Sequence, residues 1–215
     1  MKTVAKLMGD RHPILFSTPM IHAILEGRKT QTRRIVNPQP KATRLIAPVE
    51  SILWNEPEAR WLAWRHPYGG FTRSGEAWRC PFGAAGDRLW VRETFGIIKG
   101  NGIRTVYRAD GDPPPPILGT PEKNGVRKRK WTPSIFMRPA QSRITLEVTD
   151  VRVERLHAIT ELDAEAEGMR SFCACDCSQP TFREGFARGW DKINGKRGPW
   201  KTNPFVWVVS FKRAS

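Results

Sequence analysis

The chain has 215 residues, a formal net charge of +15 and nine tryptophans. This length is enough for one core with large insertions, and the basic excess favours a polyanionic partner, either nucleic acid or a nucleotide-like ligand. No apolar run approaches the ~18 residues of a transmembrane helix, and residues 1–13 lack the apolar segment of a signal peptide. With four cysteines, the sequence predicts a cytoplasmic protein with reduced thiols and no membrane association.

The first predicted elements surround a basic segment. Residues 14–16 form a short apolar strand, and a helical pattern that Ser17 can cap runs from there to Gly27, a typical helix stop. The segment 29–36 follows with an amine and a hydroxyl, Lys29 and Thr32, among arginines and without apolar alternation until its last two residues. Such a segment predicts either a site or a basic surface.

The remaining pattern indicates strands interspersed with helices. Strands are expected over 88–95, 104–110, 142–156 with a break at 149–150, and 203–213, and helices over 160–169 and 181–193. Residues 37–85 and 111–133 lack clean periodicity and are predicted to be long insertions, the first with short strands such as 58–64. Because no regular βαβ alternation exists, we expect one α+β domain over 1–215, built on a small, partly closed, mixed or antiparallel barrel with flanking helices.

In this order, the segments resemble the ASCH domain family, PUA-like β-barrels associated with RNA. The segments that carry the resemblance are EGRKTQTRR (26–34), GDRLWVRETF (86–95), RITLEVTDVRVERL (143–156), DAEAEGM (163–169) and VWVVSFK (206–212). The long insertions resemble those of larger family members from phages and prophages. The resemblance therefore implies a PUA-like barrel, with the insertions falling outside the matched segments.

Within this family, two segments are similar to those of the small bacterial N4-acetylcytidine amidohydrolase. GRKTQT resembles its G-x-K-T-x-T segment, and AEAEGM resembles its A-E-x-E-x-M helix. The resemblance implies that Lys29, Thr32 and Glu167 are catalytic, in a cofactor-independent hydrolase acting on the N4-acyl amide of a modified nucleoside or nucleobase. This chain departs from that enzyme in its greater length, its insertions, and Gly168 after the glutamate.

The chemistry of these residue types fits amide hydrolysis. A threonine hydroxyl becomes a nucleophile when a base removes its proton, and Lys29 can be that base if burial and nearby cations depress its pKa. Glu167 can protonate the leaving amine, or orient Lys29 or an attacking water. The expected substrate-binding set is Arg28, Arg33, Arg34, Arg92 and Glu93.

The residues alone leave other functions open. Lys29 and Thr32 could equally form a phosphate-binding strand, and Glu167 could be an exposed residue at a helix end. Arg92 and Glu93 could form an internal ion pair instead of lining a site. The alternatives are an RNA-binding module without catalysis, and a ribonuclease in which Lys29 and the arginines stabilise the phosphorane while Glu167 acts as base.

Three cysteines, Cys173, Cys175 and Cys177, alternate along one segment. They could hold zinc, but the C-x-C-x-C spacing differs from the usual C-x₂-C knuckle, and a loop with free thiols is the alternative. The four histidines form no cluster with ligand spacing. The sequence therefore favours chemistry without a metal.

Overall fold

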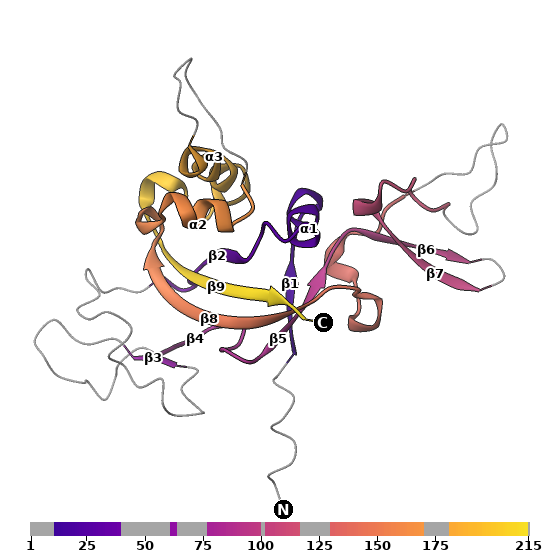
Figure 1. The fold of residues 1–215 in the computed structure, drawn as a ribbon, viewed down its shortest axis with the longest axis horizontal. Coiled ribbons are helices and arrows are strands. Elements are labelled where there is room, and N and C mark those ends of the chain that lie inside the picture. Colours follow the sequence, from indigo (N-terminus) through magenta and orange to yellow (C-terminus); the bar gives the residue numbers. More distant parts are fainter. Residues whose placement is uncertain are drawn as a thin grey trace, which may run out of the picture.

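The computed structural model describes residues 11–39, 61–63, 77–99, 102–116, 130–169 and 181–214, which form a mixed α+β fold (Figure 1). Its main sheet has five strands in the order β1-β5-β8-β9-β2. These are β1 (Arg11–Leu15), β5 (Arg88–Arg92), β8 (Thr145–Arg155), β9 (Phe205–Arg213) and β2 (Gln31–Ile35). β1 runs parallel to β5 and the other neighbours are antiparallel, so the sheet is mixed.

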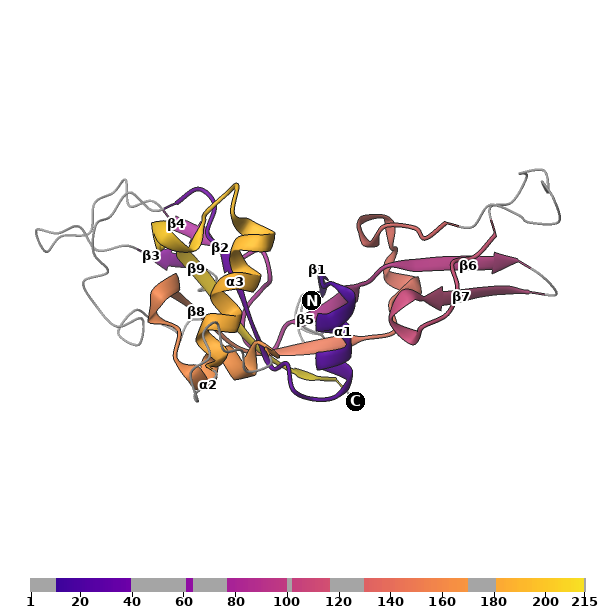
Figure 2. The same cartoon turned by 90° about the horizontal axis from the view of Figure 1, so that it is seen from above.

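Among the described residues, three α-helices and two hairpins accompany this sheet. The helices are α1 (Thr18–Leu25), α2 (Glu161–Ala166) and α3 (Phe182–Asn194). One hairpin pairs β3 (Trp61–Ala63) with β4 (Ala77–Arg79), and the other pairs β6 (Phe95–Lys99) with β7 (Ile103–Tyr107). Figures 1 and 2 both show the β6–β7 hairpin extending away from the main sheet, on the side opposite α2 and α3.

β9 is buried on both faces and divides the core in two. Phe205, Trp207 and Val209 belong to one cluster, whereas Val206 and Val208 belong to a second. The residues of α1 pack on the first cluster, and residues of α2 and α3 pack on the second. A strand covered on both sides needs apolar residues at consecutive positions, which explains the unbroken run of apolar residues in β9.

Local sequence signals placed several of these features correctly. The break predicted at 149–150 is a β-bulge between Val148 and Asp150. The helix predicted from Thr160 has a reciprocal capping box in which Thr160 and Asp163 each accept the other's backbone N–H. Gly27 has a φ of +76° and follows α1, as expected of a helix stop.

Other boundaries were wrong. The first strand was expected over 14–16, whereas it covers Arg11–Leu15 and includes Pro13. Proline is tolerated there because β1 is the outer strand of the sheet. The short strand β4 and the strand β6 were not predicted. Of the two expected insertions, residues 40–60, 64–76 and 117–129 lie outside the described part of the chain.

The two outer strands of the main sheet, β1 and β2, come close without pairing. No ladder joins them among the described residues, so the sheet is open there. The Arg34 Nη2 nevertheless donates a hydrogen bond of 2.6 Å to the Leu15 carbonyl oxygen, which links one edge to the other. No described helix combines the length and apolar character needed to cross a membrane.

The core assignment predicts unequal costs of truncation. Leu146 on β8 is fully buried, so Leu146→Ala should lower the free energy of unfolding by about 2–5 kcal/mol through lost apolar contact and a residual cavity. Ile103 on β7 is 77% exposed, and Ile103→Ala should change the free energy of unfolding by less than about 0.5 kcal/mol. Urea denaturation of both variants checks this, and equal losses would contradict the core described here.

Candidate active site

The centre of the site is a contact between the C-terminal end of α2 and the residues just before β2. The Thr30 N–H donates to the Ala166 carbonyl oxygen at 2.9 Å, and Lys29 and Glu167 form an isolated antiparallel bridge. Gly168 makes this approach possible, because a Cβ there would lie 2.9 Å from the Lys29 Cβ. Its φ of +79° also favours glycine. Gly168, which follows the glutamate in the AEAEGM segment, is thus required by this contact between α2 and the residues before β2.

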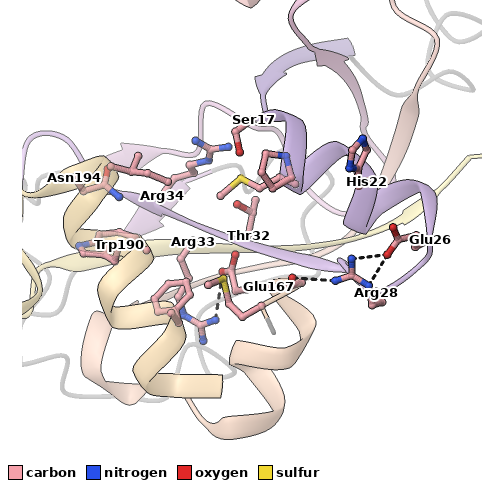
Figure 3. Close-up of a pocket in the computed structure, with 17 residues that line it drawn as sticks. Ser17, His22, Glu26, Arg28, Thr32, Arg33, Arg34, Glu167, Trp190 and Asn194 are labelled. Carbon is pink, nitrogen blue, oxygen red and sulfur yellow. Dashed lines mark hydrogen bonds and ion pairs between the residues drawn. The ribbon is translucent and has the colours of Figure 1, made fainter. Parts of the chain in front are cut away.

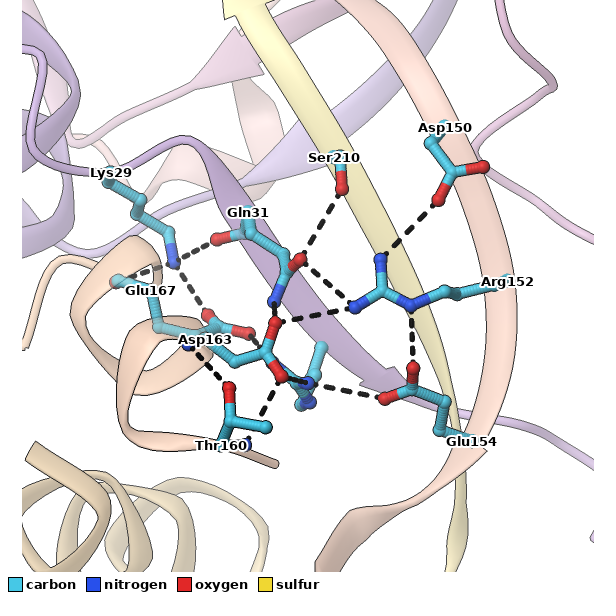
Figure 4. Close-up of polar contacts among 10 residues, drawn as sticks. Lys29, Gln31, Asp150, Arg152, Glu154, Thr160, Asp163, Glu167 and Ser210 are labelled. Carbon is cyan, nitrogen blue, oxygen red and sulfur yellow. Dashed lines mark hydrogen bonds and ion pairs between the residues drawn. The ribbon is translucent and has the colours of Figure 1, made fainter. Parts of the chain in front are cut away.

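Lys29 is fully enclosed and its ammonium is saturated with acceptors (Figure 4). Its Nζ lies 2.7 Å from Glu167 Oε2, 2.8 Å from the Glu167 carbonyl oxygen and 2.8 Å from the Gln31 carbonyl oxygen. Three acceptors match the three N–H groups of a protonated lysine. Burial lowers the pKa of Lys29, the neighbouring Glu167 opposes this, and the charges of Arg34 and Arg33 lower it further.

The same carboxylate has one oxygen bonded to lysine and one without a hydrogen bond. Glu167 Oε1 is buried and has no hydrogen-bond partner in the described structure, and Arg33 Nη1 lies 3.6 Å from it. The Glu167 side chain is only 4% exposed. The alternative of a solvent-exposed glutamate at a helix end is therefore wrong for this residue.

A network of ion pairs next to the Lys29–Glu167 pair joins β2 to α2 and β8 (Figure 4). Arg33 Nη2 lies 3.1 Å from Asp163 Oδ2 and 3.3 Å from Glu154 Oε2. Arg152 contacts the same two carboxylates, at 3.3 Å and 2.6 Å, and Gln31 donates to Asp163 Oδ1 at 3.1 Å. The alternating signs let a wholly buried guanidinium remain charged, because each cation meets a carboxylate.

A pocket of about 370 Å³ lies between α1 and α3, next to β2 (Figure 3). Its polar wall includes Thr32, Arg33, Arg34 and Glu167. Its apolar wall is formed by side chains of the helices and the segment after α2, namely Pro19, Met20, Met169, Phe186, Trp190 and Ile193. A cavity with apolar and aromatic walls and a few polar groups at one side is typical of a small-molecule site.

The structure brings the three expected catalytic residues to one place but gives them different exposures. Thr32 and Glu167 both line the pocket, and Figure 3 shows them facing the same space. Lys29 is not among the lining residues and reaches the pocket through Glu167. Within the described part of the chain, no hydrogen bond engages the Thr32 hydroxyl, which leaves it available to a ligand.

The expected substrate-binding residues divide into two groups. Arg28, Arg33 and Arg34 line the pocket, Arg28 in an ion pair with Glu26 and bonded to the Gly168 carbonyl oxygen.

The other two, Arg92 and Glu93, do not line it. Glu93 is buried and receives two hydrogen bonds from Arg143, at 2.9 and 3.0 Å, while the Arg92 guanidinium lies over the Trp90 ring. Glu93 thus belongs to an internal ion pair, although with Arg143 and not with its neighbour in sequence.

Several site residues were not found from the sequence. Asp163 caps α2, and it also pairs with Arg33 and Arg152. Trp190 packs in the second core cluster, and it also lines the pocket. The cap at Asp163 and the apolar period that includes Trp190 are local patterns that a sequence can reveal. The ion pairs of Asp163 and the pocket beside Trp190 involve residues from distant elements, which the sequence pattern does not reveal.

The described residues hold no cluster of side chains suited to ligating a metal ion. Among the described residues, no three His, Cys, Asp or Glu side chains lie close enough to hold a metal ion together. The cysteine cluster at 173, 175 and 177 falls outside them.

Comparisons with protein families, curated proteins and solved structures find no significant match to this chain.

The buried pair predicts a non-additive loss of stability. Lys29→Met should cost about 3–5 kcal/mol of unfolding free energy, because it leaves the Glu167 carboxylate buried without its closest cation and without the hydrogen bond to Oε2. The double variant Lys29→Met/Glu167→Gln should cost less than the sum of the two single variants, by about 1–3 kcal/mol. Urea unfolding of the four proteins measures this coupling, and strictly additive losses would show that the two side chains do not interact.

Asp163 predicts a defined acid sensitivity. Burial raises its pKa, but the hydrogen bonds from Gln31 and from the backbone of Thr160, with the charge of Arg33, outweigh burial and lower the pKa to about 2. The unfolded value is about 3.9, so its stabilisation is fully present above that pH and is lost as the pH falls through 2. The difference in unfolding free energy between wild type and Asp163→Asn should therefore be largest near neutrality and shrink between pH 4 and 2. A difference independent of pH would contradict this assignment.

Proposed function

We propose that this protein is a metal-independent amidohydrolase that cleaves the N4-acyl amide of acylated cytidine or cytosine. The observation that carries the proposal is the Lys29–Glu167 pair, joined at 2.7 Å from segments far apart in the sequence and placed beside a pocket that Thr32 lines. The resemblance to the ASCH family selects these three residues from sequence alone. We also propose that the curved sheet, whose outer strands are linked by Arg34 and Leu15, is a PUA-like barrel of that family.

The pocket suits a nucleobase carrying a small acyl group. Trp190 and Phe186 offer aromatic surface on which a pyrimidine ring can stack, and Met20 and Met169 supply adaptable apolar contacts. The polar groups are confined to the side formed by β2 and Glu167. A substrate held by its ring against the aromatic wall would present its exocyclic amide to Thr32.

In this mechanism Thr32 is the nucleophile and the Lys29–Glu167 pair is the acid–base unit. The Thr32 oxygen adds to the acyl carbon, and its proton passes to Glu167 Oε1, the carboxylate oxygen that has no hydrogen bond. The intermediate collapses by breaking the C–N bond, and the same proton goes to the leaving nitrogen to give the free amine. Water then cleaves the acyl-threonine, so one amide and one water yield the amine and a carboxylic acid.

Lys29 supports this exchange from behind the carboxylate. Its three hydrogen bonds orient Glu167, and its lowered pKa reduces the cost of moving a proton between Nζ and Oε2. The two groups are in direct contact at 2.7 Å, so a proton can pass between them without a bridging group. The role of base expected for Lys29 is therefore proposed for the pair, with the glutamate as the member that reaches the pocket.

Turnover of N4-acetylcytidine tests the proposal. Wild type should release cytidine and acetate, with metal chelators having no effect. Thr32→Val, which keeps the shape of the side chain but removes the hydroxyl, should abolish release, and Thr32→Ser should retain part of it. Glu167→Gln should lower kcat by about 10²- to 10⁴-fold, the range for a lost acid–base group. Product formation is followed by chromatography, and circular dichroism confirms folding.

Wild-type rates in the Thr32→Val variant would overturn the assignment of the nucleophile. Absence of cytidine release from wild type would overturn the proposed reaction itself.

The net charge of +15 favours RNA binding as a second candidate function. Exposed basic side chains lie on and beside the β6–β7 hairpin, including Arg104, Arg108, Lys130 and Arg138. An RNA-binding module would show affinity that falls steeply with salt and no turnover of acylated nucleosides. Cleavage of labelled RNA by wild type would instead select the ribonuclease alternative.

A further inference from the structure

One cation at the pocket has no carboxylate in ion-pair contact among the described residues. Lys29 and Arg33 both contact acidic side chains in or next to α2, and Arg28 pairs with Glu26. Arg34 also lines the pocket, yet within the described part of the chain it forms no ion pair. A positive charge left unpaired at a pocket is free to act on whatever negative charge enters or develops there.

The Arg34 guanidinium is fixed and still has a free donor. Its Nη2 donates to the Leu15 carbonyl oxygen at 2.6 Å, and its central carbon lies 5.3 Å from the centre of the Phe16 ring. Its Nε is buried and has no hydrogen-bond partner in the part of the chain that the structure describes. Buried polar groups are rarely left unpaired, so such a donor beside a pocket indicates a missing ligand atom.

Arg34 and Thr32 lie on the same face of β2. Residues two apart on a strand share a face and are separated by about 7 Å along it. Both line the pocket, and Figure 3 shows both side chains bordering its space. Arg33 between them also borders the pocket, but its charge is matched, because its Nη1 lies 3.6 Å from Glu167 Oε1 and its Nη2 lies 3.1 Å from Asp163 Oδ2.

We infer that Arg34 is a catalytic residue that stabilises the oxyanion formed on the acyl group, an inference that rests on the proposed hydrolase function. When the Thr32 oxygen bonds to the acyl carbon, the π electron pair of the carbonyl moves to its oxygen, which becomes negatively charged. Arg34 Nε donates to that oxygen. When the intermediate collapses, the pair returns, the C–N bond breaks, and the hydrogen bond weakens again.

This arrangement favours the transition state over the bound substrate. A neutral carbonyl oxygen interacts weakly with a guanidinium, whereas the developing oxyanion interacts strongly in an enclosed pocket, so Arg34 acts mainly on kcat. If Arg34 instead held a phosphate or carboxylate of the substrate, the charge would be present in the ground state. Its removal would then raise KM with kcat unchanged.

The test separates these effects in Arg34→Gln and Arg34→Lys, with Arg104→Gln as control. Arg104 is an exposed arginine on β7 outside the pocket, so its variant removes the same charge without touching the site. With N4-acetylcytidine as substrate, we expect Arg34→Gln to lower kcat by about 10²- to 10³-fold. KM and the affinity for cytidine, measured by calorimetry, should change less than threefold, and Arg34→Lys should retain an intermediate rate.

A second measurement does not depend on amide turnover. Methylboronic acid, which forms a tetrahedral anion on an activated hydroxyl, should give an adduct with wild type and Arg104→Gln in ¹¹B NMR but not with Arg34→Gln.

Three outcomes would overturn the inference: an unchanged kcat in folded Arg34→Gln, a raised KM at constant kcat, or a boronate adduct that survives the substitution. If wild type releases no cytidine, the proposed function fails, and the adduct experiment alone then decides whether Arg34 stabilises a tetrahedral anion.

Discussion

The site depends on one buried ion pair, in which the Lys29 ammonium meets the Glu167 carboxylate at 2.7 Å. Two charges removed from water are costly to bury, and they persist only when their remaining hydrogen-bonding groups are satisfied. Lys29 meets this condition with two backbone carbonyl oxygens in addition to the carboxylate. The pair thereby joins the end of α2 to the start of β2, and every other feature of the pocket is positioned by that junction.

The two faces of β2 have different roles because a strand presents alternate residues to opposite sides. Gln31 and Arg33 point to the side of α2, where they enter a network of matched charges with Asp163. Thr32 and Arg34 lie on the other face and line the pocket, where, among the described residues, the Thr32 hydroxyl makes no hydrogen bond and Arg34 makes no ion pair. A polar segment of four residues thus supplies structural anchoring on one face and potential reactivity on the other.

Local charge balance also separates this site from the basic character of the whole chain. The net charge of +15 suggests a polyanionic partner, but the cations nearest to Glu167 are compensated by carboxylates. The walls of the pocket are largely apolar and aromatic. These properties suit a small acylated base better than an extended phosphate backbone, whose recognition requires exposed cations. Exposed basic side chains lie instead near the β6–β7 hairpin.

The sequence by itself determined most of the local elements and named the candidate catalytic residues. Periodicity, the Thr160–Asp163 cap and Gly27 located α1, α2 and most of β8 and β9, because these signals act between residues close in the chain. The family resemblance picked out Lys29, Thr32 and Glu167, which the residues alone could not separate from a phosphate-binding surface.

Only the tertiary structure decided how those residues are arranged. It placed Lys29 in contact with Glu167 on the side away from the pocket, paired Glu93 with Arg143, and left Arg34 without an ion pair among the described residues. Each result depends on which carboxylate, distant in sequence, lies beside which cation. Neither residue spacing nor composition predicts such contacts, because they form only when the chain folds.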